Sequence, residues 1–143
     1  MQTIEEIILK DGFYMTAAQG VSMLPFIRPK VDTVVIEKVT EDCVPMEIVL
    51  YRNPSGQMVL HRIIRAQERH YLICGDNCTF LEHIEKAKVI GKLTKVYHNE
   101  KEIKLNFPIY RFYILLWCRP YRIRMMLLRV RNKMRGIVRK IRH

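Results

Sequence analysis

The pattern of apolar and polar positions divides the chain into a short helical start, a β-rich middle and a helical end. Apolar residues recur with helical spacing over residues 4–11, and Thr3 with Glu6 has the spacing of a capping box, so a short helix is expected there. From residue 31 onward the pattern is that of strands. The expected strands cover residues 34–37, 47–52, 57–64, 70–74, 87–97 and 102–107. Asn-Pro-Ser-Gly and His-Asn-Glu-Lys sequences separate two pairs of them with turn chemistry. The fold class is therefore mainly β, a compact and coiled antiparallel domain.

After Pro108 the spacing becomes helical again, and two kinds of side chain separate around the helix. At about 100° per residue, the apolar residues from Ile123 to Ile141 fall within about 60° of Ile123. The arginines and lysines occupy the rest of the circle, and only Met125 and Leu128 lie outside the apolar face. We therefore divide the chain into a β domain over residues 1–106 and a basic amphipathic helical tail over residues 107–143.

The net charge of +11 changes this picture because it lies entirely in the tail. Residues 1–106 hold 14 Lys and Arg against 14 Asp and Glu, whereas residues 107–143 hold nine Arg, two Lys and no acid. The β domain is electrically balanced and the tail is cationic.

Three partners suit such a tail: an anionic membrane surface, its own sheet with the charged face in solvent, or nucleic acid. We favour the membrane, because a helix with cations on one face and bulky apolar residues on the other suits the headgroup region. Aromatic residues of the kind found at membrane interfaces lie just upstream, and no recognised nucleic-acid motif accompanies the basic stretch. The residues expected to touch the membrane are Trp117, Arg122, Arg124, Arg129, Arg131 and Arg135.

The N-terminal residues and the cysteines exclude other classes. The first ten residues contain two glutamates and lack the basic-then-apolar order of a signal peptide. No run reaches the roughly 18–20 apolar residues that span a bilayer, so a cytoplasmic protein peripheral to the membrane is expected. Cys74 and Cys78, flanked by His70 and His83, raise a zinc site, but structural zinc sites more often begin with Cys-x-x-Cys. We expect cysteines that pack in the fold, with no metal and no cofactor.

Three residues in the β region have side chains suited to catalysis. Ser22 stands in an irregular stretch, with glycine two residues before it and proline three after, where most serines bond their own backbone. Strand alternation puts His61 on an apolar face, where it is either a core residue or one end of a site. Asp76 lies in a Gly-Asp-Asn turn, which is ordinary turn chemistry by itself. Serine, imidazole and carboxylate together supply a nucleophile, a base and an orienting acid, although the spacing alone does not establish a triad.

Read in order, the segments around these residues resemble the signal peptidase I family over about residues 20–95. The resemblance rests on Gly-Val-Ser-Met-Leu-Pro at 20–25, Val-Asp-Thr-Val-Val-Ile at 31–36, Glu-Ile-Val-Leu-Tyr-Arg at 47–52, Val-Leu-His-Arg-Ile at 59–63, Cys-Gly-Asp-Asn at 74–77 and Val-Ile-Gly-Lys at 89–92. Val31 and Met46 depart from the pattern, because they stand where the family usually has glycine.

The resemblance implies a serine endopeptidase that cleaves after small residues, with Ser22 as nucleophile and His61 as general base. A histidine in the base box places the chain near the endoplasmic-reticulum, archaeal and spore-former branch, since most bacterial members have lysine there. Asp76 is expected in the site, and Glu82, six residues later, is the rival acid for orienting His61. The backbone amide of Ser22 is the expected oxyanion donor.

One departure affects the substrate. Family members usually have a transmembrane helix just before the nucleophile box, and residues 1–19 do not form one. We therefore expect the substrate to be a small precursor peptide that loses its leader. The alternative is a non-catalytic peptidase-like module that binds membrane or precursor peptide. The sequence does not indicate an oligomeric state.

Overall fold

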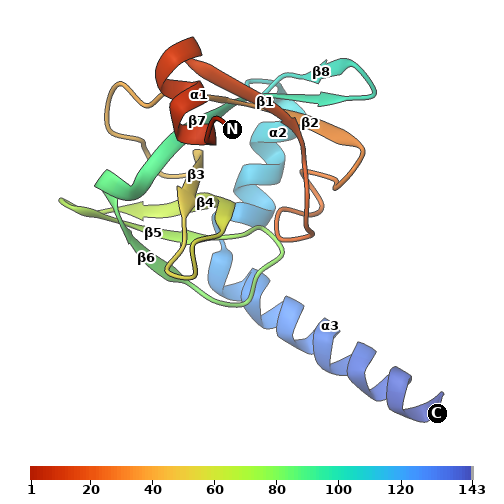
Figure 1. Ribbon diagram of the computed structural model, residues 1–143. Coiled ribbons are helices and arrows are strands. Elements are labelled where there is room, and N and C mark those ends of the chain that lie inside the picture. The colour runs from red at the N-terminus through yellow and green to blue at the C-terminus, as the bar shows by residue number, and fades with distance from the viewer. Residues whose placement is uncertain (143) are drawn as a thin grey trace.

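The computed structural model describes residues 1–142 as an eight-stranded antiparallel sheet with helices at both ends of the chain (Figure 1). This confirms the mainly β class. The strands are β1 (Phe13–Ala17), β2 (Asp32–Glu37), β3 (Ile48–Arg52), β4 (Met58–Ala66), β5 (His70–Cys74), β6 (Glu82–Glu85), β7 (Val89–His98) and β8 (Lys101–Ile103). The helices are α1 (Ile4–Asp11), the 3-10 turn η1 (Lys86–Lys88), α2 (Pro108–Tyr113), the π-helical turn η2 (Ile114–Cys118) and α3 (Tyr121–Ile141).

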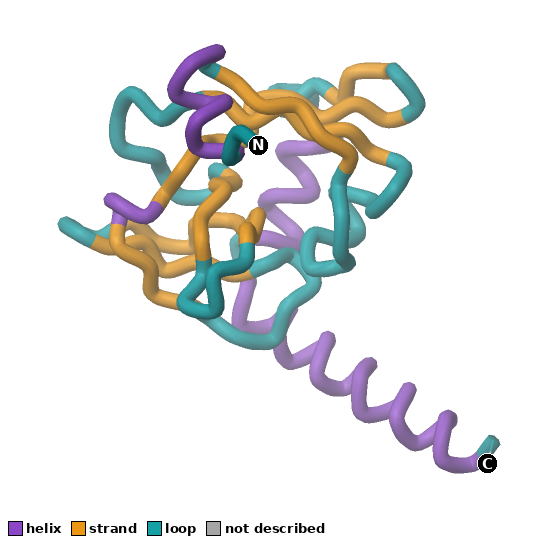
Figure 2. The backbone as a smooth tube through the Cα atoms, in the orientation of Figure 1, coloured by secondary structure: helices purple, strands orange, loops and turns teal. Residues whose placement is uncertain are grey.

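The sheet runs in the order β1-β2-β7-β3-β4-β5-β6, and β8 pairs with the end of β7. Both expected hairpin turns are present: residues 53–57 join β3 to β4, and residues 99–100 join β7 to β8 with positive φ angles. The expected strand over residues 102–107 is wrong in length, because β8 ends at Ile103. Figure 2 shows how the strands coil around one another rather than forming a flat layer.

The N-terminal helix forms as its sequence predicts. Thr3 Oγ1 accepts from the Glu6 amide at 3.2 Å, and Glu6 Oε2 accepts from the Thr3 amide at 2.9 Å, which completes the capping box. The helix buries Ile8 against Ile36 and Leu93 of the sheet. This cluster is the core of the half of the sheet that carries β1, β2 and β7, and a second cluster lies between β3, β4, β5 and β6.

The tail docks on the domain with a face other than the one the helical wheel singled out. Met125 and Leu128, which lie outside the predicted apolar face, are 8% and 2% exposed, and Met125 packs on Ile64 and Leu72. Beyond these first turns α3 extends away from the domain (Figures 1 and 2). Within residues 1–142, no helix combines the length and the apolarity needed to cross a bilayer.

This docking corrects one expectation. Arg124 was expected at a membrane, but it is 1% exposed and its guanidinium donates to the carbonyls of Trp117 and Cys118 at 3.4 and 3.5 Å. Its side chain leaves α3 on the docked face, which turns it toward the domain.

Candidate active site

Ser22 lies in the loop between β1 and β2, and the turn after β5 holds that loop in place. Gly20, with φ of 72°, turns the chain just before the serine. The Asn77 amide donates to the Ser22 carbonyl at 2.8 Å, and Asn77 Nδ2 donates to the Val21 carbonyl at 3.0 Å. The position of Ser22 is therefore set by the turn over residues 75–78.

The same turn brings Ser22 close to His61. A Cβ added to Gly75 would lie 2.6 Å from Cys78 Sγ, 2.7 Å from the Ser22 carbonyl oxygen and 3.0 Å from His61 Nε2. These three groups surround one backbone position, so only glycine leaves room for them. The backbone carbonyl of Ser22 and the ring of His61 thus both lie against Gly75.

His61, on β4, is 3% exposed, and its hydrogen bonds fix its tautomer. Tyr51 lies 3.2 Å from His61 Nδ1, and its hydroxyl donates to Glu82 Oε2 at 2.8 Å. Because that hydroxyl proton is committed to Glu82, the Tyr51 oxygen accepts from His61. Nδ1 therefore carries the hydrogen and Nε2 presents its lone pair toward Gly75.

Burial keeps both His61 and Tyr51 uncharged near neutral pH. Burial lowers the pKa of His61 below its ordinary value of 6.5, and the charges of Glu82 and Asp76 oppose that shift. Burial and the bond to Glu82 raise the pKa of Tyr51, so its hydroxyl stays protonated. A neutral imidazole whose Nε2 carries no hydrogen is the form that accepts a proton from a hydroxyl.

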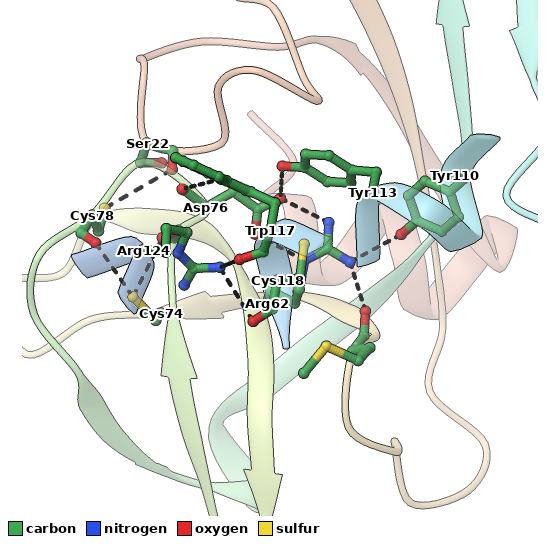
Figure 3. A network of polar contacts seen from close by, with 12 residues as sticks. Ser22, Arg62, Cys74, Asp76, Cys78, Tyr110, Tyr113, Trp117, Cys118 and Arg124 are labelled. Atoms are coloured by element: carbon green, nitrogen blue, oxygen red, sulfur yellow. Dashed lines mark hydrogen bonds and ion pairs between the residues drawn. The ribbon is translucent and has the colours of Figure 1, made fainter. Parts of the chain in front are cut away.

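The acid connected to His61 is Glu82, through Tyr51, and the expectation that Asp76 orients the imidazole is not met. Both Asp76 oxygens are used elsewhere: Arg62 Nε and Nη2 donate to Oδ1 and Oδ2, each at 2.8 Å, and the Tyr113 hydroxyl donates to Oδ2 at 2.7 Å. Arg62 and Asp76 are 0% exposed and form a buried bidentate ion pair. Asp76 thus anchors the turn that carries Gly75, at the centre of the network in Figure 3.

The tail covers this ion pair. Arg62 Nη1 donates to the hydroxyl of Tyr110 at 2.9 Å, and the guanidinium lies 5.8–5.9 Å from the ring centres of Phe26, Tyr110 and Tyr113. The Trp117 indole N–H donates to the Asp76 carbonyl at 3.1 Å. Trp117 is expected at a membrane surface from the sequence, but its polar edge is bound to the turn over residues 75–78 instead (Figure 3).

A thiol stands between the serine loop and the histidine. Cys78 Sγ lies 3.9 Å from His61 Nε2 and 3.9 Å from the Ser22 carbonyl oxygen. Burial raises the pKa of Cys78 to about 11, so the thiol is protonated at neutral pH. The Ser22 hydroxyl makes no hydrogen bond to His61 in residues 1–142; such bonds are often long without substrate and tighten when it binds.

The cysteines and the other possible metal ligands do not cluster in the described part of the chain. All four cysteines are free, and no group of three or more His, Cys, Asp or Glu within residues 1–142 is close enough together to hold an ion.

An apolar cleft of about 470 Å³ adjoins Ser22. Its walls include Tyr14 and Ala17 from β1 and the adjoining residue Ala18, with Met58 and Leu60 from β4. Two backbone edges in these walls have no strand partner within the described residues. β1 pairs only with β2, and Met58–Leu60 pair only with β3 because the pairing to β5 begins at Arg62.

Sequence reasoning missed Tyr51, Arg62, Gly75 and Cys78 as parts of the site. Gly75 precedes Asp76 and Arg62 follows His61. Tyr51 lies within residues 47–52, one of the segments that resemble the signal peptidase I family. Nothing in the sequence pattern predicts the contacts of these residues. Comparisons of the chain with protein-family models, with curated proteins and with solved structures found no match.

Proposed function

We propose that the chain is a serine endopeptidase of the signal peptidase I type, with Ser22 as nucleophile and His61 as general base. The observation that supports this most strongly is that the backbone of the Ser22 loop and Nε2 of a tautomer-fixed His61 both lie against Gly75, with the Cys78 thiol beside them. The resemblance of the flanking segments agrees with this assignment.

In the proposed reaction, Ser22 Oγ forms a bond to the carbonyl carbon of the scissile peptide while His61 Nε2 takes the hydroxyl proton. The backbone N–H of Ser22 donates to the developing oxyanion. His61 then gives the proton to the leaving amine as the C–N bond breaks, and a water molecule hydrolyses the acyl-enzyme with His61 again as base. Throughout, the N–H at His61 Nδ1 stays hydrogen-bonded to the Tyr51 oxygen. The Glu82 carboxylate, which accepts the Tyr51 hydroxyl, stabilises the imidazolium.

The cleft suits an extended peptide substrate. The free edges of β1 and of Met58–Leu60 offer backbone hydrogen bonds on both sides, the mode in which a strand is added to a sheet. The apolar lining beside Ser22 would hold small side chains before the cleaved bond, as the family resemblance implies. The proposed substrate is a precursor peptide that loses a leader segment.

The test is peptide cleavage followed by mass spectrometry over a library of precursor peptides. Ser22→Ala should abolish cleavage without changing the unfolding transition. Ser55→Ala is the matched control, because Ser55 is the only other serine and lies in the exposed β3–β4 turn. Cleavage that survives Ser22→Ala would disprove the assignment.

A non-catalytic binding module is the second candidate, and one observation favours it. The Ser22 hydroxyl makes no hydrogen bond to His61 in residues 1–142, and the atom that lies 3.9 Å from His61 Nε2 is the Sγ of Cys78 instead. Under this reading, wild type and Ser22→Ala bind a precursor peptide equally and neither turns it over. Serine-dependent turnover of any peptide excludes it.

A further inference from the structure

The outer face of α3 is apolar and exposed over its whole length. Ile123, Val130, Met134 and Ile141 are 58%, 53%, 61% and 78% exposed, although they point to one side of the helix. The face consists of Ile123, Met126, Leu127, Val130, Met134, Ile137, Val138 and Ile141. A contiguous apolar surface of this size on a folded protein indicates a partner.

This face is not needed to hold the helix on the domain. Arg124, Met125 and Leu128 do that from another side, and Arg129 adds a hydrogen bond to the Thr79 carbonyl at 3.1 Å. The remaining turns of α3 extend clear of the sheet (Figure 1). The domain therefore leaves the whole outer face to something else.

Cations border the outer face on both sides. At about 100° per residue, one row falls about 80–160° to one side of Ile123 and a second row about 80–120° to the other. The first row is Arg131, Arg135, Arg139 and Arg142, and the second is Arg122, Arg129, Lys133 and Lys140. An apolar centre between two cationic borders matches the layering of a bilayer, with acyl chains below and anionic headgroups on either side.

We propose that residues 107–142 dock on an anionic membrane surface, with the outer face of α3 inserted between the headgroups. Residues 107–142 contain no acidic residue, so every ionised side chain that the segment exposes is attracted to such a surface. A second copy of the chain would bring the same cations into contact with these, and nucleic acid would leave the apolar centre unburied. The proposal does not depend on the peptidase assignment.

The proposal assigns the membrane contacts differently from the sequence alone. Arg124 and Trp117 take no part, because one is buried and the other is bound to Asp76. The insertion comes from the apolar residues of α3, and Arg122, Arg131 and Arg135 lie at its borders.

The experiment is co-sedimentation of the full chain with vesicles of phosphatidylglycerol and phosphatidylcholine, and with phosphatidylcholine alone. The test variant is Val130→Gln with Met134→Gln. The matched control is Leu9→Gln with Val44→Gln, which makes the same kind of change at exposed apolar positions outside the tail (67% and 55% exposed). Thermal unfolding should be the same for all three proteins, since none of these side chains is buried.

We expect wild type to bind the anionic vesicles tightly and to bind phosphatidylcholine alone more weakly, by about tenfold or more. The tail variant alone should lose about tenfold or more in affinity for the anionic vesicles. Three results would overturn the proposal. The first is a tail variant that binds anionic vesicles like wild type, and the second is tighter binding of wild type to duplex RNA or DNA than to anionic vesicles at the same salt. The third is a wild-type protein that does not bind vesicles but forms a concentration-dependent dimer, which the tail variant abolishes. Repeating the assay with Ser22→Ala, which should bind vesicles normally, keeps failure of docking distinct from failure of the peptidase assignment.

Discussion

Adding one methyl group at Gly75 should separate the parts of the proposed site. Gly75→Ala places a Cβ 2.7 Å from the Ser22 carbonyl oxygen, where ordinary contact begins near 3.4 Å. Because that oxygen belongs to the backbone, the loop that carries Ser22 must shift by roughly 0.7 Å to restore ordinary contact. The side chains of Cys78 and His61 must shift as well.

The expected loss follows from this displacement. A misplacement of about 1 Å at a reacting group costs on the order of 100-fold in rate, so Gly75→Ala should lower kcat/KM by on the order of tenfold or more. The crowding itself should cost about 1–3 kcal/mol of the free energy of unfolding. The assays are peptide cleavage and urea unfolding of the same preparation.

Two other glycines provide controls. A Cβ at Gly91 would lie 2.5 Å from Ile36 Cγ2 and 2.8 Å from the Glu37 carbonyl, so Gly91→Ala should lose similar stability but keep its kcat/KM once folded. A Cβ at Gly136 would meet nothing within 4 Å, and Gly136→Ala should stabilise α3 by about 0.5–1 kcal/mol. A folded Gly75→Ala protein that cleaves peptide as fast as wild type would contradict the proposed role of this turn.

Three further predictions concern the two acids and the imidazole. Tyr51→Phe disconnects His61 from Glu82 and should lower kcat by on the order of 100-fold, whereas a change below threefold in steady-state cleavage would contradict the assigned link. Asp76→Asn leaves the charge of Arg62 buried without its carboxylate and should cost about 3–5 kcal/mol in urea unfolding; unchanged stability would show that the pair is not structural. Because burial lowers the pKa of His61, kcat/KM should stay level as pH falls below 6.5 and drop only at more acidic pH. The unfolded chain takes up this proton first, so stability should decline as pH falls from about 6.5 toward the folded pKa, and His61→Gln should lack that component in urea titrations over the same range.

The sequence predicted the central strands and the N-terminal helix because their patterns are strong. The two missed strands, β1 and β6, lie at the edges of the sheet. Burial in β1 alternates only between exposed and half-buried positions, and in β6 only Ile84 is buried, so neither strand has the alternation of fully buried and exposed residues that marks a half-buried strand.

The candidate site was predicted in its residue types but not in its contacts. Nothing local predicts that Arg62 is buried, because its burial depends on Asp76 from a later turn and on Tyr110 and Tyr113 from the tail. The choice between Asp76 and Glu82 likewise depends on Tyr51, whose hydroxyl lies between an acid and an imidazole that are distant in sequence.

The hydrogen bond from Trp117 to Asp76 allows intrinsic tryptophan fluorescence to report on the contact between the tail and the β domain. Trp117 is the only tryptophan in the chain, and its indole lies where the tail touches the turn over residues 75–78. Its emission therefore senses whether tail and turn are joined, while circular dichroism follows the sheet. If the tail lifts from the turn before the sheet melts, the two probes will report different midpoints in one urea titration.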